Sequence, residues 1–376
     1  MNRCTKCILP ENTPKIEFDA RGICNFCTSH TPITYLGQTE LEKELKRHLP
    51  ARGKYDVLVP LSGGKDSTYV LLQLHAMLGK RVLAYNYDNG LVHPQAQDNV
   101  RGLTERLGVD LIVRRNEQQR ERMIANLKAY LRKPDPAMVT MLCTSCRYGI
   151  MGNAYKIARE HKIPLVVIGW SPVEDTPFKE ELLKGSGRSV MTGLMRRLVK
   201  NPAYASPVNL SAAAKDYFHN YSHVKNGHPL LRMLYPNVSL LQYYEYIPYN
   251  PDQIQREVTA RAGWRTPDGE DSWQFDCKIK LLQNYLYSSA LEYTATDSYL
   301  SAMIRENFID RDEALRRLTY LQSKDLPKTE QLHAFLRECA LDDLVKYFPA
   351  RTRDKNEAPV PMPEKQPGKE MAVKTK

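Results

Sequence analysis

The sequence predicts an α/β protein in which helices cover a parallel sheet, with a small cysteine-rich ribbon before the sheet and a helical region after it. Apolar β-branched runs alternate with helical patterns between residues 50 and 173, which is typical of a parallel sheet with helices on both faces. Two C-x-x-C pairs lie within residues 1–35. Residues 174–350 show helical periodicity and no convincing parallel strand.

The composition is that of a globular enzyme. Of 376 residues, 42% are hydrophobic and 26% are charged, which is enough chain for two domains or one large domain with appendages. No apolar run approaches the roughly 18 residues of a membrane span, and the N-terminus does not read as a signal, so we expect a cytoplasmic protein. The net charge of +11 indicates an anionic partner. Residues 351–376 are rich in charge and proline and predict a disordered tail.

Two cysteine pairs define the N-terminal ribbon, with a predicted hairpin at residues 16–22 between them. Four thiolates with this spacing can close a tetrahedron around zinc at about 2.3 Å per Zn–S bond. A ribbon this small has too little core to fold without a metal. The sequence therefore predicts a structural zinc site on Cys4, Cys7, Cys24 and Cys27. A reduced thiol-rich arm or an iron site is the alternative.

The elements follow in a regular order. Residues 39–48 predict a connecting helix. Strands are predicted at 55–60, 81–87, 109–113 and 164–168, and helices at 65–78, 94–107, 117–132 and 146–161. Two or three amphipathic helices within residues 276–318 return to cover the site. Ligands of parallel α/β sheets bind at the carboxyl ends of the strands, which is where Asp88 and Gly169 fall.

The loop that follows the first strand reads SGGKDS, residues 62–67. Its glycines, two hydroxyls and one lysine at a helix N-terminus are suited to hold a phosphate. The loop is not a Walker A motif, because Val59 stands where glycine is required and Asp66 where serine or threonine is required. The G-x-G-x-x-G of dinucleotide folds is also lacking. An ordinary glycine turn is the bland alternative.

An SGGKDS loop after a strand resembles the PP-loop of the ATP pyrophosphatases, the adenine nucleotide alpha-hydrolase superfamily. The resemblance implies that ATP is split to AMP and pyrophosphate while a substrate oxygen is adenylated. It implies that the pyrophosphate is held by Ser62, Gly63, Gly64, Lys65, Asp66 and Ser67, and that the adenosine lies beside Tyr87 and Asp88.

Within this resemblance, two loop residues are expected to take part in catalysis. Lys65 would balance charge on the leaving pyrophosphate, and Asp66 would hold Mg²⁺ or fix the loop. Glu174 or Asp175, just past Gly169, would hold metal or substrate, or form a solvated acidic pair.

Two subgroups of the superfamily are similar to different parts of the chain. The ribbon, the PP-loop and the stretch SAMIRENFIDRDEAL resemble the bacterial N-acetyl sugar amidotransferases over roughly residues 1–35, 55–90, 155–170 and 273–318. That resemblance implies conversion of an acetamido into an acetamidino group for surface polysaccharide, with ammonia from a glutaminase subunit.

A third C-x-x-C departs from the sugar enzymes. Cys143 and Cys146 stand at the entrance of a helix, which favours a thiolate. The arrangement resembles sulfur-inserting PP-loop enzymes that thiolate tRNA bases, where such a pair joins a distant cysteine to hold a 4Fe–4S cluster or carries a persulfide. Cys277 is then the natural third ligand, because Cys339 has core-like spacing. A structural metal or inert thiols are the alternatives.

The predicted function is adenylation of a carbonyl oxygen by ATP, followed by its replacement with sulfur in a small molecule or a base. The expected cofactors are ATP, Mg²⁺ and Zn²⁺, with an iron–sulfur cluster on the second cysteine group. A sulfur donor is the expected partner, or a glutaminase subunit in the sugar amidotransferase alternative. A tRNA substrate ranks below a small molecule, because no basic stripe with interleaved aromatic residues stands out. A non-catalytic nucleotide-binding module is the third class.

Overall fold

A five-stranded sheet forms the centre of the computed structural model, which describes residues 2–49, 53–143, 146–174, 177–185, 189–205, 209–210, 233–267, 275–325 and 329–349. The strands lie in the order β3-β2-β1-β4-β5, and each pairs in parallel with its neighbour. Their bounds are β1 Val57–Pro60, β2 Val82–Asp88, β3 Leu111–Arg115, β4 Leu165–Ile168 and β5 Ser239–Gln242. The predicted parallel α/β fold is confirmed.

The fifth strand corrects the sequence analysis, which expected no parallel strand beyond residue 174. β5 pairs with β4 from Leu165 opposite Ser239 to Ile168 opposite Gln242. Only four residues form this edge strand, and only Leu241 among them is fully buried. A strand so short and so little buried leaves no period-2 signal, so the neighbouring strand, not the local sequence, determines its conformation.

Helices cover both faces of the sheet because successive side chains of the central strand point to opposite faces. Val57 and Val59 of β1 pack in one core with α3 Lys65–Leu78 and α4 Pro94–Leu107. Leu58 packs in a second core with α6 Cys146–Glu160 on the other face. All three helices lie within one residue of their predicted bounds.

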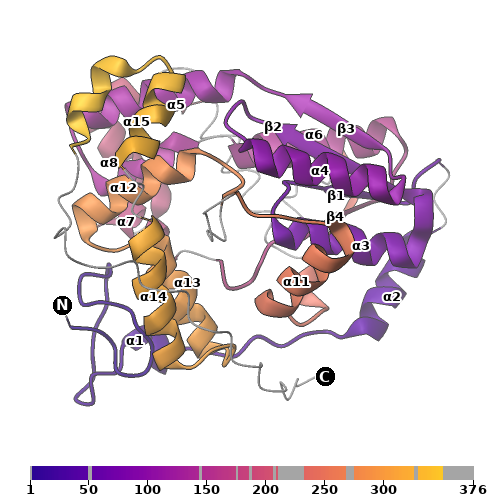
Figure 1. The fold of residues 1–376 in the computed structure, drawn as a ribbon, viewed down its shortest axis with the longest axis horizontal. Coiled ribbons are helices and arrows are strands. Elements are labelled where there is room, and N and C mark those ends of the chain that lie inside the picture. Colours follow the sequence, from indigo (N-terminus) through magenta and orange to yellow (C-terminus); the bar gives the residue numbers. More distant parts are fainter. Residues whose placement is uncertain are drawn as a thin grey trace.

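A second body of helices lies beside the sheet and carries its own core (Figure 1). It contains α5 Gln118–Arg132, α7 Pro177–Lys184, α8 Val190–Lys200, α12 Ile279–Leu291 and α15 Thr329–Glu338. The helices α13 Ala295–Arg305 and α14 Arg311–Asp325 bury side chains in the core that α3 and α4 share with the sheet. The helices α2 Gln38–His48 and α11 Pro251–Glu257 pack beside α3 on the sheet (Figure 1). Among the described residues, no helix has the length and apolarity needed to cross a membrane.

The N-terminal ribbon, which includes the short helix α1 Asn25–Thr28, is fixed to α13 and α14. Arg3 forms an ion pair of 2.8 Å with the fully buried carboxylate of Asp297. Arg311 donates through Nε to the carbonyl oxygen of Cys7 at 3.1 Å, and His30 lies 2.9 Å from a Glu306 carboxylate oxygen. These contacts attach the ribbon to the C-terminal helices, 300 residues away in the chain.

The strand order reverses beside β1, because β2 and β3 lie on one side of it and β4 and β5 on the other. At such a reversal the loops after the two strands diverge, and a crevice opens outside their carboxyl ends. The loop after β1 is SGGKDS, and the loop after β4 begins at Gly169. The sheet topology therefore places the predicted phosphate loop at the expected binding crevice.

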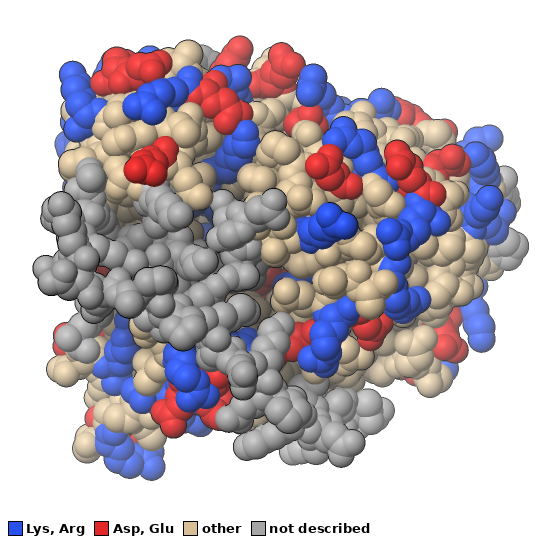
Figure 2. Space-filling view, viewed as in Figure 1, with Lys and Arg blue, Asp and Glu red and all other residues tan. Residues whose placement is uncertain are grey.

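On the face shown in Figure 2, basic and acidic side chains are interspersed over the sheet and its helices. The coloured residues on this face form no separate basic stripe.

Candidate functional site

The loop between β1 and α3 is held rigidly by groups that lie outside it. Gly63 has φ of +86°, and a Cβ there would lie 2.1 Å from the carbonyl oxygen of Ala96. The carbonyl oxygen of Gly63 accepts hydrogen bonds from Trp264 Nε1 at 2.9 Å and from Asn99 Nδ2 at 3.2 Å. Only glycine fits this combination of positive φ and close approach.

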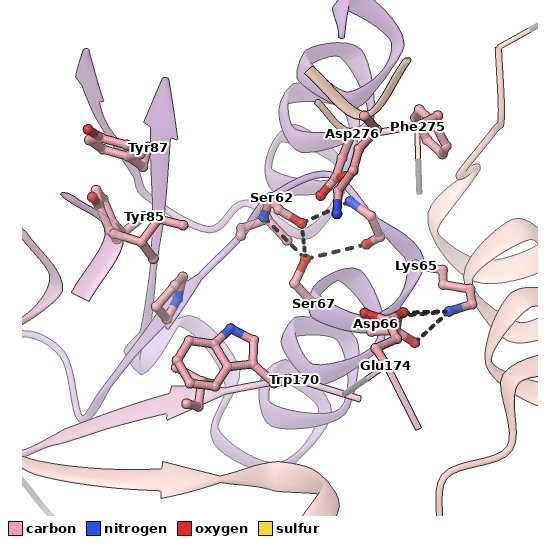
Figure 3. Close-up of a pocket in the computed structure, with 17 residues that line it drawn as sticks. Ser62, Lys65, Asp66, Ser67, Tyr85, Tyr87, Trp170, Glu174, Phe275 and Asp276 are labelled. Atoms are coloured by element: carbon pink, nitrogen blue, oxygen red, sulfur yellow. Dashed lines mark hydrogen bonds and ion pairs between the residues drawn. The ribbon is translucent and has the colours of Figure 1, made fainter. Parts of the chain in front are cut away.

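Two serine hydroxyls face each other across the loop (Figure 3). Gly64 N donates to Ser62 Oγ at 3.2 Å, and Ser62 N donates to Ser67 Oγ at 3.2 Å. The two hydroxyl oxygens are themselves 3.2 Å apart. Because α3 begins directly after Gly64, its N-terminal N–H groups add a positive dipole end to these hydroxyls. The geometry is that of an anion site.

A cavity of about 280 Å³ opens in front of this loop. The predicted residues that line it are Ser62, Gly64, Lys65, Asp66, Ser67, Tyr87, Gly169 and Glu174. Sequence reasoning missed the other lining residues, which include the polar or aromatic side chains of Tyr85, Trp170, Phe275, Asp276 and Lys280. Three of them, Phe275, Asp276 and Lys280, lie in the stretch FDCKIK around Cys277, and their nearness to that cysteine is the signal that was available.

Lys65 does not face the two serine hydroxyls. Its ammonium lies 2.7 and 2.9 Å from the carboxylate oxygens of Asp66 and donates to Tyr249 Oη at 2.9 Å (Figure 3). The side chain is 5% exposed. Burial acts to lower the pKa of Lys65, but the charges of Asp66, Tyr299 and Glu174 outweigh burial and raise it. In this conformation Lys65 neutralises Asp66.

The cavity holds two more carboxyl groups and a second lysine. Burial raises the pKa of Glu174 to about 8, and the negative charge of Asp66 adds to that rise. Burial also raises the pKa of Asp276, while the charge of Lys280 opposes the shift. Asp175 lies outside the described residues.

The two residues predicted beside the adenosine lie differently. Tyr87 lines the cavity, and Gly149 of α6 is so close that a Cβ there would come within 2.3 Å of the tyrosine ring. Asp88 is not among the lining residues. Its carboxylate accepts from Gly90 N at 2.9 Å and from Arg115 Nε at 3.0 Å, so it stabilises the turn after β2 and its contact with β3.

The second cysteine group comes together from three segments. Cys143 ends the 3₁₀ helix Pro136–Cys143, Cys146 begins α6, and Cys277 pairs with Val92 in an antiparallel bridge. Asn89 Nδ2 donates to Cys146 Sγ at 3.5 Å and to Cys277 Sγ at 3.7 Å. Cys143 Sγ accepts from Gln283 Nε2 at 3.2 Å. All three residues are partly exposed, while burial raises the pKa of the Cys277 thiol to about 12.

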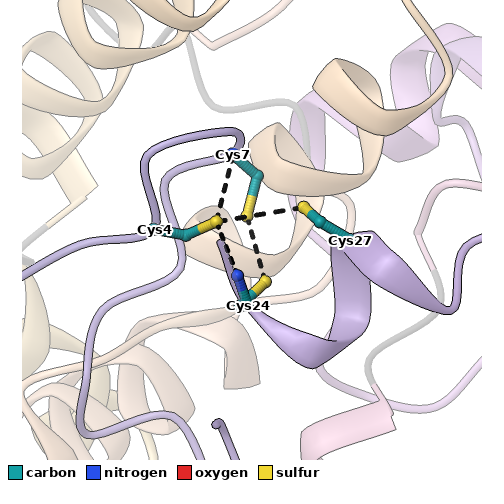
Figure 4. A group of neighbouring side chains, drawn as sticks. All are labelled: Cys4, Cys7, Cys24 and Cys27. Carbon is teal, nitrogen blue, oxygen red and sulfur yellow. Dashed lines mark hydrogen bonds between the residues drawn. The ribbon is translucent and has the colours of Figure 1, made fainter. Parts of the chain in front are cut away.

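The four cysteines of the ribbon form a tighter group (Figure 4). Their sulfur atoms all lie within 4.8 Å of one another, with pairs at 4.0 Å and 3.7 Å. Four thiolates around one tetrahedral ion at 2.3 Å stand about 3.8 Å apart. Within the described part of the chain, this is the group whose spacing suits a single metal ion. The buried cluster therefore fits a metal.

Comparisons with known proteins were made on sequence and on structure. No family model matches the chain. An uncharacterised protein of Methanocaldococcus jannaschii is 28% identical over 115 residues, which are 30% of this chain and 42% of that protein. The chain thus spans less than half the length of the curated relative that it matches.

Three solved structures are similar to the chain. The first is the U34-tRNA thiolase NcsA from Methanococcus maripaludis with its 4Fe–4S cluster, at 13% identity and a TM-score of 0.33, covering 96% of this chain and 94% of that chain. The second is the NMN synthetase from Francisella tularensis, at 14% identity and a TM-score of 0.32, covering 72% of this chain and 92% of that chain. The third is the NH3-dependent NAD synthetase from Campylobacter jejuni, at 12% identity and a TM-score of 0.28, covering 62% of this chain and 97% of that chain. All three are PP-loop superfamily members, the superfamily that the SGGKDS loop resembles.

Replacing Gly63 by alanine tests the rigidity of the loop. The Cβ clash with Ala96 and the positive φ predict a loss of about 1–3 kcal/mol in unfolding free energy and loss of ATP binding. Gly102→Ala is the matched control, because a Cβ at this glycine of α4 would have no atom within 4 Å. Alanine has the higher helix propensity, so this variant should be slightly more stable than the wild type. Denaturant titration and calorimetry measure both effects. Wild-type ATP affinity in Gly63→Ala would contradict the assignment.

Proposed function

We propose that this chain is a PP-loop enzyme that adenylates a substrate carbonyl oxygen with ATP and then replaces that oxygen with sulfur. The observation that carries the proposal is the path of residues 275–277. Phe275 and Asp276 line the cavity at the phosphate loop, and the next residue, Cys277, shares an amide donor with Cys146. One short segment thus joins the anion site to a thiol group.

The phosphate side of the cavity supports a nucleotide with a divalent cation. Three carboxyl groups (Asp66, Glu174 and Asp276) and two lysines (Lys65 and Lys280) line it. A polyphosphate adds negative charge next to these carboxyl groups, and a divalent cation that enters with it would offset that charge. Carboxylate oxygens are the ligands that Mg²⁺ prefers, and Asp66 with Glu174 would hold it.

Lys280 is the lysine that we assign to the pyrophosphate. Lys65 is engaged by Asp66 and Tyr249, whereas no ion pair within 4 Å involves Lys280 among the described residues. Lys280 lies in the first turn of α12, next to Asp276 on the cavity wall. There its charge would stabilise the leaving pyrophosphate.

The reaction follows from this arrangement in two displacements. The substrate carbonyl oxygen attacks the α-phosphorus, the bond to pyrophosphate breaks, and the substrate carbon becomes bonded to an adenylated oxygen. Sulfur at the oxidation level of sulfide then attacks that carbon, and AMP leaves with the oxygen. No electron is gained or lost in either step. The protein positions the groups and stabilises charge.

The second cysteine group fits a cluster better than a single ion. Cys143, Cys146 and Cys277 do not fall within the spacing that suits one metal, but each is partly exposed and accepts from an amide. Ligands of an iron–sulfur cluster bind separate irons and are therefore spaced more widely. A 4Fe–4S cluster on three thiols would leave one iron without a protein ligand, which would be free to bind sulfide.

The ribbon cluster is assigned a structural role and zinc. All four thiols are buried, and backbone N–H groups of Cys7, Leu9 and Cys24 donate to the sulfurs at 3.2–3.5 Å. Four protein ligands leave no open position for chemistry.

The expected partners are a small-molecule substrate and a sulfur donor. We rank a small molecule above a tRNA, because an extended nucleic acid is held by gathered basic side chains and no basic stripe with interleaved aromatic residues stands out in the sequence. The sugar amidotransferase reading, with a glutaminase partner, becomes an outcome of the tests below.

The nucleotide product is the first test. With ATP, sulfide and a low-molecular-weight cell extract, the protein should release AMP and pyrophosphate, as resolved by chromatography. Ser67→Ala removes a hydroxyl that faces the anion site and should cut turnover about 10²-fold. Ser289→Ala, on an exposed position of α12, should leave turnover unchanged. Formation of ADP by the wild type would contradict the adenylation chemistry.

The second test separates sulfur from nitrogen. Cys146→Ala should abolish incorporation of labelled sulfide into product while ATP binding survives, because the SGGKDS loop is untouched. Cys339→Ala, a buried cysteine of the helical core, is the control and should retain activity. If a Cys143→Ala/Cys146→Ala double variant remains active with ammonium salts, the enzyme is an amidotransferase.

The third test concerns the ribbon. Cys24→Ser should release one zinc ion per chain and lower the stability of the ribbon and its contacts with α13 and α14, leaving the sheet folded. Elemental analysis and limited proteolysis report the two effects. Cys339→Ser should keep its zinc. An unchanged zinc content in Cys24→Ser would refute the assignment.

A further inference from the structure

We propose that Asn89 is a positioning residue that joins Cys146 to Cys277 by giving one N–H to each sulfur. The inference rests on the proposed function of the second cysteine group and deepens it. Nothing in the sequence pattern singles out Asn89, which lies between Asp88 and Gly90 in an ordinary Asn-Gly turn.

The Asn89 amide has a fixed orientation. Its Oδ1 accepts from the backbone N–H of Leu91 at 2.9 Å, which directs Nδ2 toward the two sulfurs at 3.5 and 3.7 Å. The residue is 6% exposed. An amide nitrogen carries two hydrogens, and here it faces two acceptors. A buried amide whose oxygen and nitrogen are both hydrogen-bonded is poorly replaced by any other side chain.

The turn that carries Asn89 is itself held in place. The Asp88 carboxylate accepts from Gly90 N and from Arg115 Nε, and Asn116 N donates to the carbonyl oxygen of Asp88 at 2.8 Å. The carboxylate predicted to contact adenosine therefore fixes the backbone on which Asn89 stands. This explains why Asp88 is buried yet absent from the cavity wall.

The two sulfurs come from separate elements, and the Asn89 side chain contacts both. Cys146 is the first residue of α6, and Cys277 lies in the segment that pairs with Val92. The third sulfur, Cys143 Sγ, accepts a hydrogen bond from Gln283 Nε2 at 3.2 Å. Two buried amides thus serve three thiols, an arrangement that suits a group whose charge resides on sulfur.

Loss of this donor has a defined consequence for a bound cluster. Hydrogen bonds to the sulfurs stabilise the more negative, reduced form, so their removal makes the reduction potential more negative. Outer partners of metal ligands typically contribute 10–100-fold to metal affinity. We expect Asn89→Leu, which keeps the size and removes the donor, to lose iron to a chelator about tenfold faster.

The experiment uses the full-length chain, reconstituted anaerobically with iron and sulfide. Iron release to a chelator and the reduction potential are measured for wild type, Asn89→Leu and Asn89→Asp. Asn89→Asp keeps the acceptor to Leu91 and lacks the N–H groups, so it tests the donor even if Asn89→Leu unfolds. Asn201→Leu is the control, because its amide donates to the carbonyl oxygen of Ala129, not to sulfur. Wild-type iron release and potential in both Asn89 variants would overturn the proposal.

A metal-free measurement separates this proposal from the proposed function. Dibromobimane cross-links neighbouring thiols, and peptide mapping identifies the Cys146–Cys277 product. Its yield, relative to single labelling by monobromobimane, should fall at least threefold in Asn89→Leu and stay unchanged in Asn201→Leu. If the wild type binds no iron but the cross-link yield still falls in Asn89→Leu, the cluster assignment is wrong and Asn89 still positions the two cysteines. An unchanged cross-link yield overturns the positioning role.

Discussion

The site depends on a short backbone pairing between residues 91–93 and residues 276–278. His93 N donates to the carbonyl oxygen of Asp276 at 3.0 Å, and Lys278 N donates to that of Leu91 at 2.9 Å. Each hydrogen bond contributes only about 1 kcal/mol. They matter because they hold residues 276–278 against residues 91–93, just beyond the carboxyl end of β2. Asp276 then faces the phosphate loop, and Cys277 faces Cys146.

The carboxyl groups of the cavity are buried, so their negative charge is not fully compensated by the protein alone. Burial raises the pKa of Glu174 to about 8 and also raises that of Asp276, so part of the negative charge is held as protonated carboxyl. Raised carboxyl pKa values mean that ionising these groups costs free energy in the folded chain. A cation entering with the nucleotide would remove that cost. The same reasoning explains why Lys65, ion-paired and fully enclosed, is poorly placed to meet the phosphates.

The sequence predicted the framework closely and the contents of the site only in part. α3 and α4 were placed at their observed ends, because glycines at 79 and 108 and Pro94 mark them chemically. β5 was missed, since its pairing with β4, and not its own residues, creates it. Asp276 and Lys280 reach the cavity through a long-range contact that no local pattern encodes. Asp88 was correctly placed at a strand end, but its side chain turns toward Arg115.

The two cysteine groups differ in the donors that surround them, and this difference supports the roles proposed for them. In the ribbon, the sulfurs are buried and accept from backbone N–H groups that the local fold fixes. Such a site is closed, rigid and contributes to folding. In the second group, the cysteine residues are partly exposed, and their sulfurs accept from the side chains of Asn89 and Gln283. Side-chain donors brought from separate elements allow the ligand geometry and electronics to be adjusted without altering the fold, which is what a reactive centre requires and a structural one does not.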